Sequence, residues 1–126
     1  MIVYVDTSDV REGALDELKA GMGELVELVE ATEPRLLAYN VYLSADGTRM
    51  TVVHVHSDAA SLEKHFEIIA PVLRRFVGLV TLSSIHVYGE PGEKVLEQLH
   101  EKASLLGRDS VVVDGLHAGF TRLPDR

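Results

Sequence analysis

The sequence contains no cysteine among its 126 residues. Disulfide bonds, thiolate catalysis and cysteine-based metal or iron–sulfur sites are therefore excluded. The longest apolar runs fall far short of the roughly 20 residues that cross a bilayer, so no transmembrane helix is expected. The first residues, MIVYVDTSD, have neither the basic nor the apolar region of a signal peptide, and we expect a cytoplasmic protein.

Basic residues are scarce, because twelve Lys and Arg stand against twenty Asp and Glu, for a net charge of −8. An acidic surface repels phosphate groups, so we expect neither nucleic acid nor an anionic membrane surface as a partner. What is present is an ordinary globular composition, with 46% hydrophobic residues. Its length fits one domain over residues 1–126, with residues 91–126 as a C-terminal extension.

The clearest local pattern is a β-hairpin over residues 35–57, RLLAYNVYLSADGTRMTVVHVHS. Asp46-Gly47 between two alternating runs is a strong signal for a two-residue turn. With this turn, Tyr39 faces His54 across the hairpin and shares a side of the sheet with His56. The other predicted pairs are Leu43–Met50, Val41–Val52 and Leu37–His56.

The other elements follow from apolar periodicity and from cap and breaker residues. A strand is expected at 2–6, and a helix of about 20 residues should begin at a capping box of Asp9 and Glu12 and end before Pro34. A second helix follows Asp58 and is interrupted at Pro71. A strand at 79–88, a helix from Pro91 to Gly107 and a broken terminal strand complete the chain. The order β-α-β-β-α-β predicts a ferredoxin-like α+β fold, with an antiparallel sheet covered by helices on one face.

The valines of the strands suggest which face the helices cover. We expect Val3, Val5, Val53, Val55, Ile85 and Val87 under the helices. Period two then places a polar set on the opposite side: Tyr4, Asp6, Tyr39, His54, His56, Ser84 and His86. His65 would reach this set from its helix. The same side would carry Leu37, Val41, Met50, Val52, Val80 and Leu82, which is too apolar to stay wet, so we expect a homodimer formed through this sheet face.

A few polar groups around an apolar cavity are typical of a small-molecule site. Histidine with aspartate can act as an acid–base pair near neutral pH. His54 and His56, two apart on a strand, would also suit a metal. Because Asp6 is the one obvious carboxylate on that side, we expect neither a tightly bound metal nor a cofactor. A hydrogen-bonded structural role for the histidines remains open.

Residues 52–67, VVHVHSDAASLEKHFE, resemble the third strand and following helix of the antibiotic biosynthesis monooxygenase family. The matching residues are Ser57, Asp58, Ala59, Ala60, Leu62, His65 and Phe66. His54 stands where a Glu is usual, and His56 stands where a Trp is usual. The resemblance covers about the first 90 residues.

The resemblance implies a dimeric α+β barrel. It also implies oxidation of a small, electron-rich aromatic or polyketide-like molecule by O₂ without a prosthetic group. His54 or His86 would act as base and Tyr39 would orient the substrate, with Tyr4, Asp6, His56, His65 and Ser84 as further binding residues. The alternative is a non-catalytic small-molecule-binding or assembly protein of the same fold.

Overall fold

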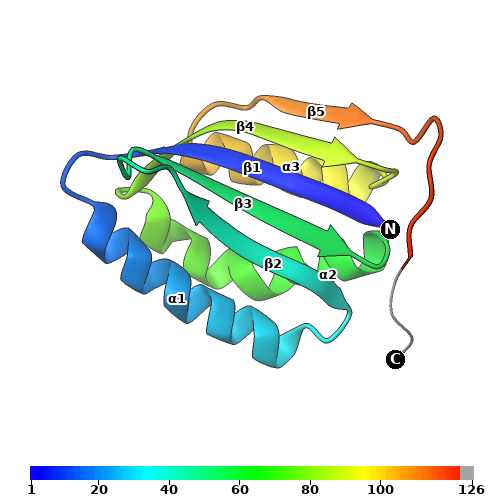
Figure 1. The fold of residues 1–126 in the computed structure, drawn as a ribbon, viewed down its shortest axis with the longest axis horizontal. Helices are drawn as coiled ribbons and strands as arrows, with labels where there is room; N and C mark the ends of the chain where they lie inside the picture. The colour runs from blue at the N-terminus through cyan, green and yellow to red at the C-terminus, as the bar shows by residue number, and fades with distance from the viewer. Residues whose placement is uncertain (123–126) are drawn as a thin grey trace.

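The computed structural model describes residues 1–122, which form one sheet with helices packed on one of its faces (Figure 1). The strand order is β2-β3-β1-β4-β5, with β5 parallel to β4 and the other neighbouring pairs antiparallel. This is the expected ferredoxin-like α+β arrangement with an added helix and strand. The elements are β1 (Ile2–Val10), α1 (Leu15–Thr32), β2 (Leu36–Leu43), β3 (Arg49–His56), α2 (Ala59–Ile69), the 3₁₀ helix η1 (Ala70–Phe76), β4 (Val80–Tyr88), α3 (Glu93–Leu106) and β5 (Val111–Asp114).

The hairpin forms as the turn residues predicted. Gly47 has a φ of 73°, which glycine adopts without strain, and the carboxylate of Asp46 accepts hydrogen bonds from the hydroxyls of Ser44 and Thr48. The predicted pairs Tyr39–His54, Val41–Val52 and Leu43–Met50 are confirmed. The pair Leu37–His56 is wrong, because an irregularity between residues 36 and 38 places Leu36 opposite His56.

The two helix starts differ in outcome. Asp9 does not cap α1, because β1 continues to Val10 and pairs Asp9 with Arg49. Asp58 does cap α2, since its carboxylate accepts a hydrogen bond from the backbone N–H of Ser61 at 2.9 Å. Pro71 lies in η1, directly after α2, so the expected interruption takes the form of a tighter helix.

The assignment of the sheet's faces from the valines is wrong for β1 and β3. Tyr4, Asp6, His54 and His56 are at most 3% exposed and lie on the same side as the core, whereas the valines that alternate with them are only half-buried. Met50, Val52, Val80 and Leu82 also belong to the core rather than to the open face. The polar residues of β1 and β3 turn inward because buried partners on the helices and neighbouring strands satisfy them.

A bulge in β4 separates His86 from the other histidines. Along β1, Thr7 pairs with Ser84 and Ser8 pairs with Leu82, so β4 carries one extra residue. The hydroxyl of Ser83 donates a hydrogen bond to the carbonyl of Thr7 at 2.8 Å in this region. An extra residue reverses which alternate side chains face the core. Leu82 before the bulge and Ile85 after it are therefore both buried.

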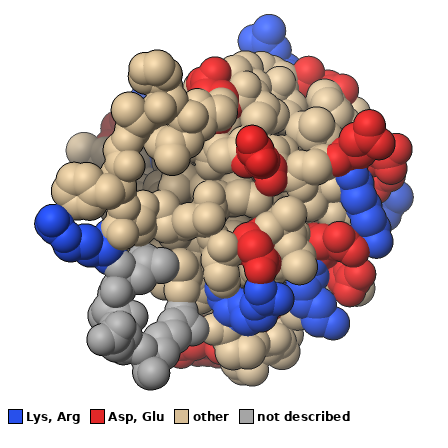
Figure 2. Space-filling view, turned by 90° about the vertical axis from the view of Figure 1, so that its right-hand side faces the viewer, with Lys and Arg blue, Asp and Glu red and all other residues tan. Residues whose placement is uncertain are grey.

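The charge on the surface is mixed. On the face that Figure 2 shows, Lys and Arg side chains stand beside Asp and Glu and form no continuous basic patch. Among residues 1–122, none of the helices combines the length and apolar character needed to cross a bilayer.

Candidate functional site

Three histidines meet between the sheet and helix α2. His54 and His56 come from β3 and His65 comes from α2, and all three are at most 1% exposed. Their ring centroids lie 5.2 Å apart for His54 and His65, 5.5 Å for His56 and His65, and 6.0 Å for His54 and His56. We call this group the imidazole cluster.

His54 is the inner end of a buried chain of polar groups. Its Nε2 lies 3.1 Å from Oδ2 of Asp6 on β1, and the same oxygen accepts a hydrogen bond from Nζ of Lys102 on α3 at 3.0 Å. Lys102 also donates to the hydroxyl of Tyr4, whose ring packs edge-on against His54 at 4.0 Å. The cation and the carboxylate neutralise each other inside the fold, which is the usual condition for burying either.

The electrostatics of this chain favour an ionised Asp6 and a neutral His54. Burial alone would raise the pKa of Asp6, but Lys102 and His54 outweigh it and hold the pKa well below its usual value. Burial lowers the pKa of His54 well below its usual value, although the carboxylate of Asp6 opposes this shift. Burial and the nearby Asp6 raise the pKa of Tyr4, so its hydroxyl stays protonated.

The other two histidines are also held by one ring nitrogen each. Nδ1 of His65 lies 3.0 and 2.9 Å from the two carboxylate oxygens of Glu33, which follows the last turn of α1. Nδ1 of His56 lies 3.0 Å from the hydroxyl of Ser61. Burial, with the nearby His65, lowers the pKa of His56 to about 3, so this ring is neutral at physiological pH.

Each ring of the imidazole cluster keeps one buried nitrogen without a partner. Within the part of the chain that the structure describes, these atoms are Nδ1 of His54, Nε2 of His56 and Nε2 of His65. Buried polar groups are normally hydrogen-bonded, so three such atoms in one cluster are unusual. They give the cluster an unused capacity to accept or donate protons.

Tyr39 of β2 packs against two members of the cluster. Its ring centroid lies 4.8 Å from that of His54 and 5.4 Å from that of His65. Burial, together with the carboxylates of Asp6 and Glu33, raises the pKa of its hydroxyl, which therefore remains a hydrogen-bond donor at neutral pH.

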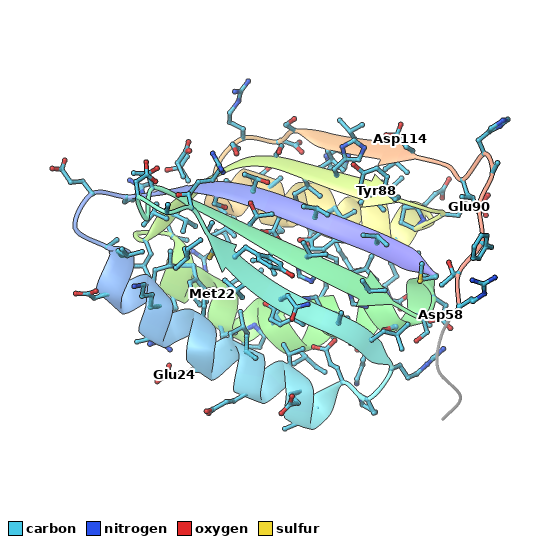
Figure 3. All side chains as sticks on the ribbon, in the orientation of Figure 1. Met22, Glu24, Asp58, Tyr88, Glu90 and Asp114 are labelled. Atoms are coloured by element: carbon cyan, nitrogen blue, oxygen red, sulfur yellow. The ribbon has the colours of Figure 1, made fainter. Side chains whose placement is uncertain are left out.

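A small internal cavity lies next to the cluster. Its volume is about 30 Å³, room for about two water molecules. Asp6, Ser8, Tyr39 and Lys102 form its polar wall, and the rest is apolar: Met22, Leu25, Met50, Val52, Ile69, Leu73, Phe76, Val80, Leu82 and Leu106. Met22 points from α1 toward the sheet (Figure 3). An apolar chamber with a few charged groups at one wall can bind a small, mostly apolar molecule that carries a polar group.

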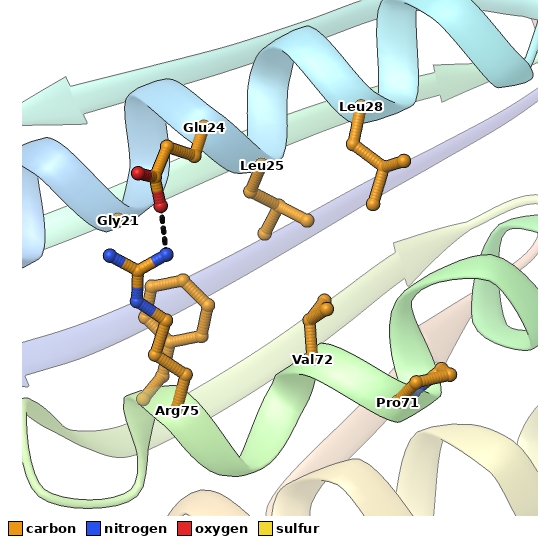
Figure 4. A pocket seen from close by; sticks show the side chains of 8 residues that line it. Gly21, Glu24, Leu25, Leu28, Pro71, Val72 and Arg75 are labelled. Atoms are coloured by element: carbon orange, nitrogen blue, oxygen red, sulfur yellow. Dashed lines mark hydrogen bonds and ion pairs between the residues drawn. The ribbon is translucent and has the colours of Figure 1, made fainter.

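Three outer grooves share lining residues with this cavity, and one of them, of about 430 Å³ between α3 and the end of α2 with η1, shares Leu73 and Lys102 with it. The other two bear on access to the cavity. The first, of about 370 Å³, lies between α1 and η1; Leu25 and Phe76 line both it and the cavity. An ion pair of Glu24 with Arg75 joins α1 to η1 across this groove (Figure 4). The second, of about 360 Å³, lies between the end of α1 and β2, and Glu33 and Tyr39 line it. Tyr39 thus separates the second groove from the cavity.

The structure brings together six of the eight residues named from the sequence: Tyr4, Asp6, Tyr39, His54, His56 and His65. His86 does not join them, because the β4 bulge turns it to the open side of the sheet, where it contacts Asp114 and stacks on Tyr88 at 4.3 Å. The expectation that His86 shares a cavity with His54 is therefore wrong. Ser84 is half-buried and pairs with Thr7 at the bulge.

Sequence reasoning missed Lys102, Glu33 and Ser61. Lys102 had a detectable signal, because it follows Leu99 by three residues and precedes Leu106 by four, which places a charge on the apolar stripe of its helix. Glu33 and Ser61 stand beside a proline and in the first turn of a helix, where polar residues are ordinary.

Within residues 1–122, no group of three or more His, Asp or Glu side chains has an arrangement that could hold a metal ion. The chemistry available to this set is proton transfer and hydrogen bonding by imidazole, carboxylate, ammonium and phenol groups.

The sequence matches no protein-family model and no curated protein. Solved structures do share its fold. MupZ from Pseudomonas fluorescens superimposes with a TM-score of 0.75 at 22% sequence identity, over 96% of this chain and 93% of that one. Rv0793 from Mycobacterium tuberculosis gives a TM-score of 0.62 at 18% identity, over 73% of this chain and 96% of that one.

A structure named antibiotic biosynthesis monooxygenase gives a TM-score of 0.58 at 20% identity, over 69% of this chain and 93% of that one. At identities this low, the likeness concerns the fold and not the chemistry. The match to MupZ covers so much of this chain that it must extend beyond residue 90. The chain therefore has the fold of the antibiotic biosynthesis monooxygenase-like structures, as the resemblance of residues 52–67 implied.

Proposed function

We propose that the interior of this fold is an acid–base site that oxidises a small, electron-rich phenol or enol with O₂ and without a prosthetic group. The observation that carries the proposal is the buried pair of His54 and Asp6 beside a mainly apolar cavity. Asp6 orients the imidazole through Nε2, and the lowered pKa of His54 leaves a neutral ring at physiological pH. A neutral imidazole fixed by a carboxylate is the arrangement that general base catalysis requires.

Lys102 supplies the second requirement, which is a positive charge where the substrate becomes an anion. It lines the cavity together with Asp6 and Tyr39. An ammonium group in an apolar chamber stabilises a phenolate or enolate far more than the same group in water. Tyr39 stays protonated and would donate a hydrogen bond to the same oxygen.

The reaction balances with O₂ as the oxidant. The phenol hydroxyl loses its proton to the Asp6–His54 pair, and the electron-rich ring carbon forms a C–O bond to O₂, giving a peroxide that takes up a proton. Cleavage of the O–O bond, with loss of the proton on that ring carbon, releases water and leaves a carbonyl. One O₂ is consumed for each quinone and each water formed.

A substrate must enter a cavity that is too small for it in the closed structure. We take the groove between α1 and η1 as the entrance, because Leu25 and Phe76 line both this groove and the cavity. The pair Glu24–Arg75 closes the groove with an exposed ion pair, which typically contributes less than about 1 kcal/mol. Breaking this ion pair to open the groove therefore costs little free energy.

The test is consumption of O₂ by the purified protein with a panel of hydroquinones, naphthols and anthrones. We expect His54→Asn and Asp6→Asn to lose about 10²–10⁴-fold in rate, the range of general acid–base catalysis. His100→Asn, which changes an exposed histidine of α3, should leave the rate unchanged. Saturable binding of these compounds with no O₂ consumption would favour the alternative, a binding protein of the same fold.

We also propose that two copies associate through the open face of the sheet. The expected interface of Leu37, Val41 and Val52 is wrong in its residues, since Val52 is buried under the helices. The open face is nevertheless apolar. It carries half-buried Val3, Val5, Val53 and Val55, with more exposed Tyr42, Tyr88 and Val112 around them. A second copy of the sheet would cover a patch of this composition.

A further inference from the structure

We propose that the imidazole cluster is a proton path that links Asp6 at the internal cavity to Glu33 in the groove between α1 and β2. The proposal rests on the proposed acid–base function, because it says where the proton taken from the substrate goes. Glu33 would be the group that exchanges protons with solvent. Its role would be to position and exchange protons, since it does not touch the cavity.

The two ends of the path are open to different spaces. Asp6 lines the internal cavity, whereas Glu33 lines the groove between the end of α1 and β2. Neither residue is open to bulk water in the closed structure, since Asp6 is 3% exposed and Glu33 is 6% exposed. The imidazoles of His54 and His65 lie between these two carboxylates.

In both His54 and His65, one ring nitrogen contacts a carboxylate and the other has no partner, which suits proton transfer from ring to ring. His54 turns Nε2 to Asp6 and keeps Nδ1 unpartnered, whereas His65 turns Nδ1 to Glu33 and keeps Nε2 unpartnered. Each ring therefore holds a carboxylate with one nitrogen and has the other nitrogen left over inside the cluster. The two rings are 5.2 Å apart between centroids, a gap that one water molecule or a ring rotation bridges.

Transfer along this path moves one proton from Asp6 to Glu33 and leaves both imidazoles neutral. While Asp6 is ionised, the single proton of neutral His54 lies on Nε2, which donates to the carboxylate. Once Asp6 has taken up a proton, His54 changes to the tautomer with its proton on Nδ1. Nε2 then accepts the proton of Asp6 as Nδ1 passes its proton to Nε2 of His65, and the proton on Nδ1 of His65 passes to Glu33. The groups around the path are all accounted for: Tyr39 lies beside both rings, His56 lies beside His65, and Lys102 with Tyr4 contacts Asp6. Both phenols stay protonated, so they do not divert the proton.

The test measures exchange of the His54 ring proton with solvent by ¹⁵N and ¹H NMR, in the protein without substrate. In Glu33→Gln the amide cannot take up a proton, and we expect this exchange to slow by about tenfold or more. Glu30→Gln is the matched control, because Glu30 lines the same groove but is exposed and makes no contact with the cluster. Equal exchange rates in wild type and Glu33→Gln would overturn the proposal.

Three further measurements keep the result interpretable. If Glu33→Gln does not fold, the resting pattern of the wild type decides: protons on Nε2 of His54 and Nδ1 of His65 support the path. One tightly bound zinc per chain on the unpartnered nitrogens would refute it. With an oxidisable phenol, Glu33→Gln should slow turnover and added imidazole should restore it. Since proton exchange needs no turnover, a failed oxidation assay and a failed proton path give different results.

Discussion

The two faces of the sheet differ in what covers them, and this difference decides where polar residues lie. On β3, His54 and His56 face the helices and are almost fully buried, whereas Val53 and Val55 face outward and are half-buried. Hydrophobicity alone would assign the faces the other way round. The helix side accepts histidines because Asp6, Ser61 and Glu33 meet their ring nitrogens there.

A polar residue in a strand therefore does not mark the solvent-facing side when the helices packed on the sheet supply its hydrogen-bond partners. Burial of a paired polar group costs little, while burial of an unpaired one costs several kcal/mol. The open face can be made of valines because each is a small apolar patch that a second copy of the sheet would cover. Four predictions test this contrast.

The largest effect is expected from a charge on the helix side of β3. Val52→Asp places a carboxylate among core residues with no partner, at a cost of about 3–5 kcal/mol or more, and we expect the chain to be unfolded. Val53→Asp, its neighbour on the open face, should cost about 1 kcal/mol in the monomer. Urea denaturation followed by circular dichroism measures both. Equal losses would contradict the assignment of faces.

Removal of the cation from the buried chain should give the next largest loss. Lys102→Met leaves the carboxylate of Asp6 buried with its charge uncompensated, which typically costs about 3–5 kcal/mol. The double variant Asp6→Asn with Lys102→Met should recover most of this loss, because it removes both charges. Lys94→Met, which breaks an exposed pair with Glu63, is the control and should change stability by less than about 1 kcal/mol.

The third prediction concerns how the unfolding free energy depends on pH through His56, on the helix side of the sheet. The pKa of His56 is lowered to about 3 from a usual value of 6.5, so the unfolded chain binds the proton first as the pH falls. Its contribution to stability is complete above pH 6.5 and is lost as the pH falls toward 3. In His56→Asn, the slope of unfolding free energy against pH in this range should decrease by up to about 1.4 kcal/mol per pH unit. His100→Asn should leave the slope unchanged, and an equal decrease in both variants would refute the assignment.

The smallest effect on the stability of the monomer, but a clear one on assembly, is expected on the open face. Val53→Lys puts a cation at the proposed contact between two sheets without disturbing the core. We expect wild type to be a dimer at micromolar concentration and the variant a monomer, with a change in unfolding free energy of the monomer below about 1 kcal/mol. Light scattering during size-exclusion chromatography measures this. A wild-type monomer would rule out the open-face dimer.

Much of the fold could be predicted because its signals are local. Asp46-Gly47 determined the hairpin register, Asp58 marked the start of α2, and period two kept Tyr4, Asp6, His54 and His56 on a common side of the sheet. These predictions depend on neighbouring residues or on strict alternation, which a single sequence contains.

The parts that failed depend on contacts between distant segments. The extra residue in β4, which no glycine or proline marked, placed Val80 and Leu82 in the core while His86 stayed on the open face, away from His54. The choice between the two faces depended on Lys102 and Glu33, which lie on other elements far along the chain. The site was therefore predictable as a set of residues that share a side, but not as a buried network.

The distance in sequence between Asp6 and Lys102, 96 residues, has a consequence for how the protein is made. During synthesis β1 leaves the ribosome long before α3. Asp6 therefore lacks its ion-pair partner, Lys102, until the chain is nearly complete. Contacts of such long range form late and slow folding. Chains truncated before α3 should remain open, stay attached to chaperones and be sensitive to proteases. Helix α3 would then complete the site and the fold in the same late step.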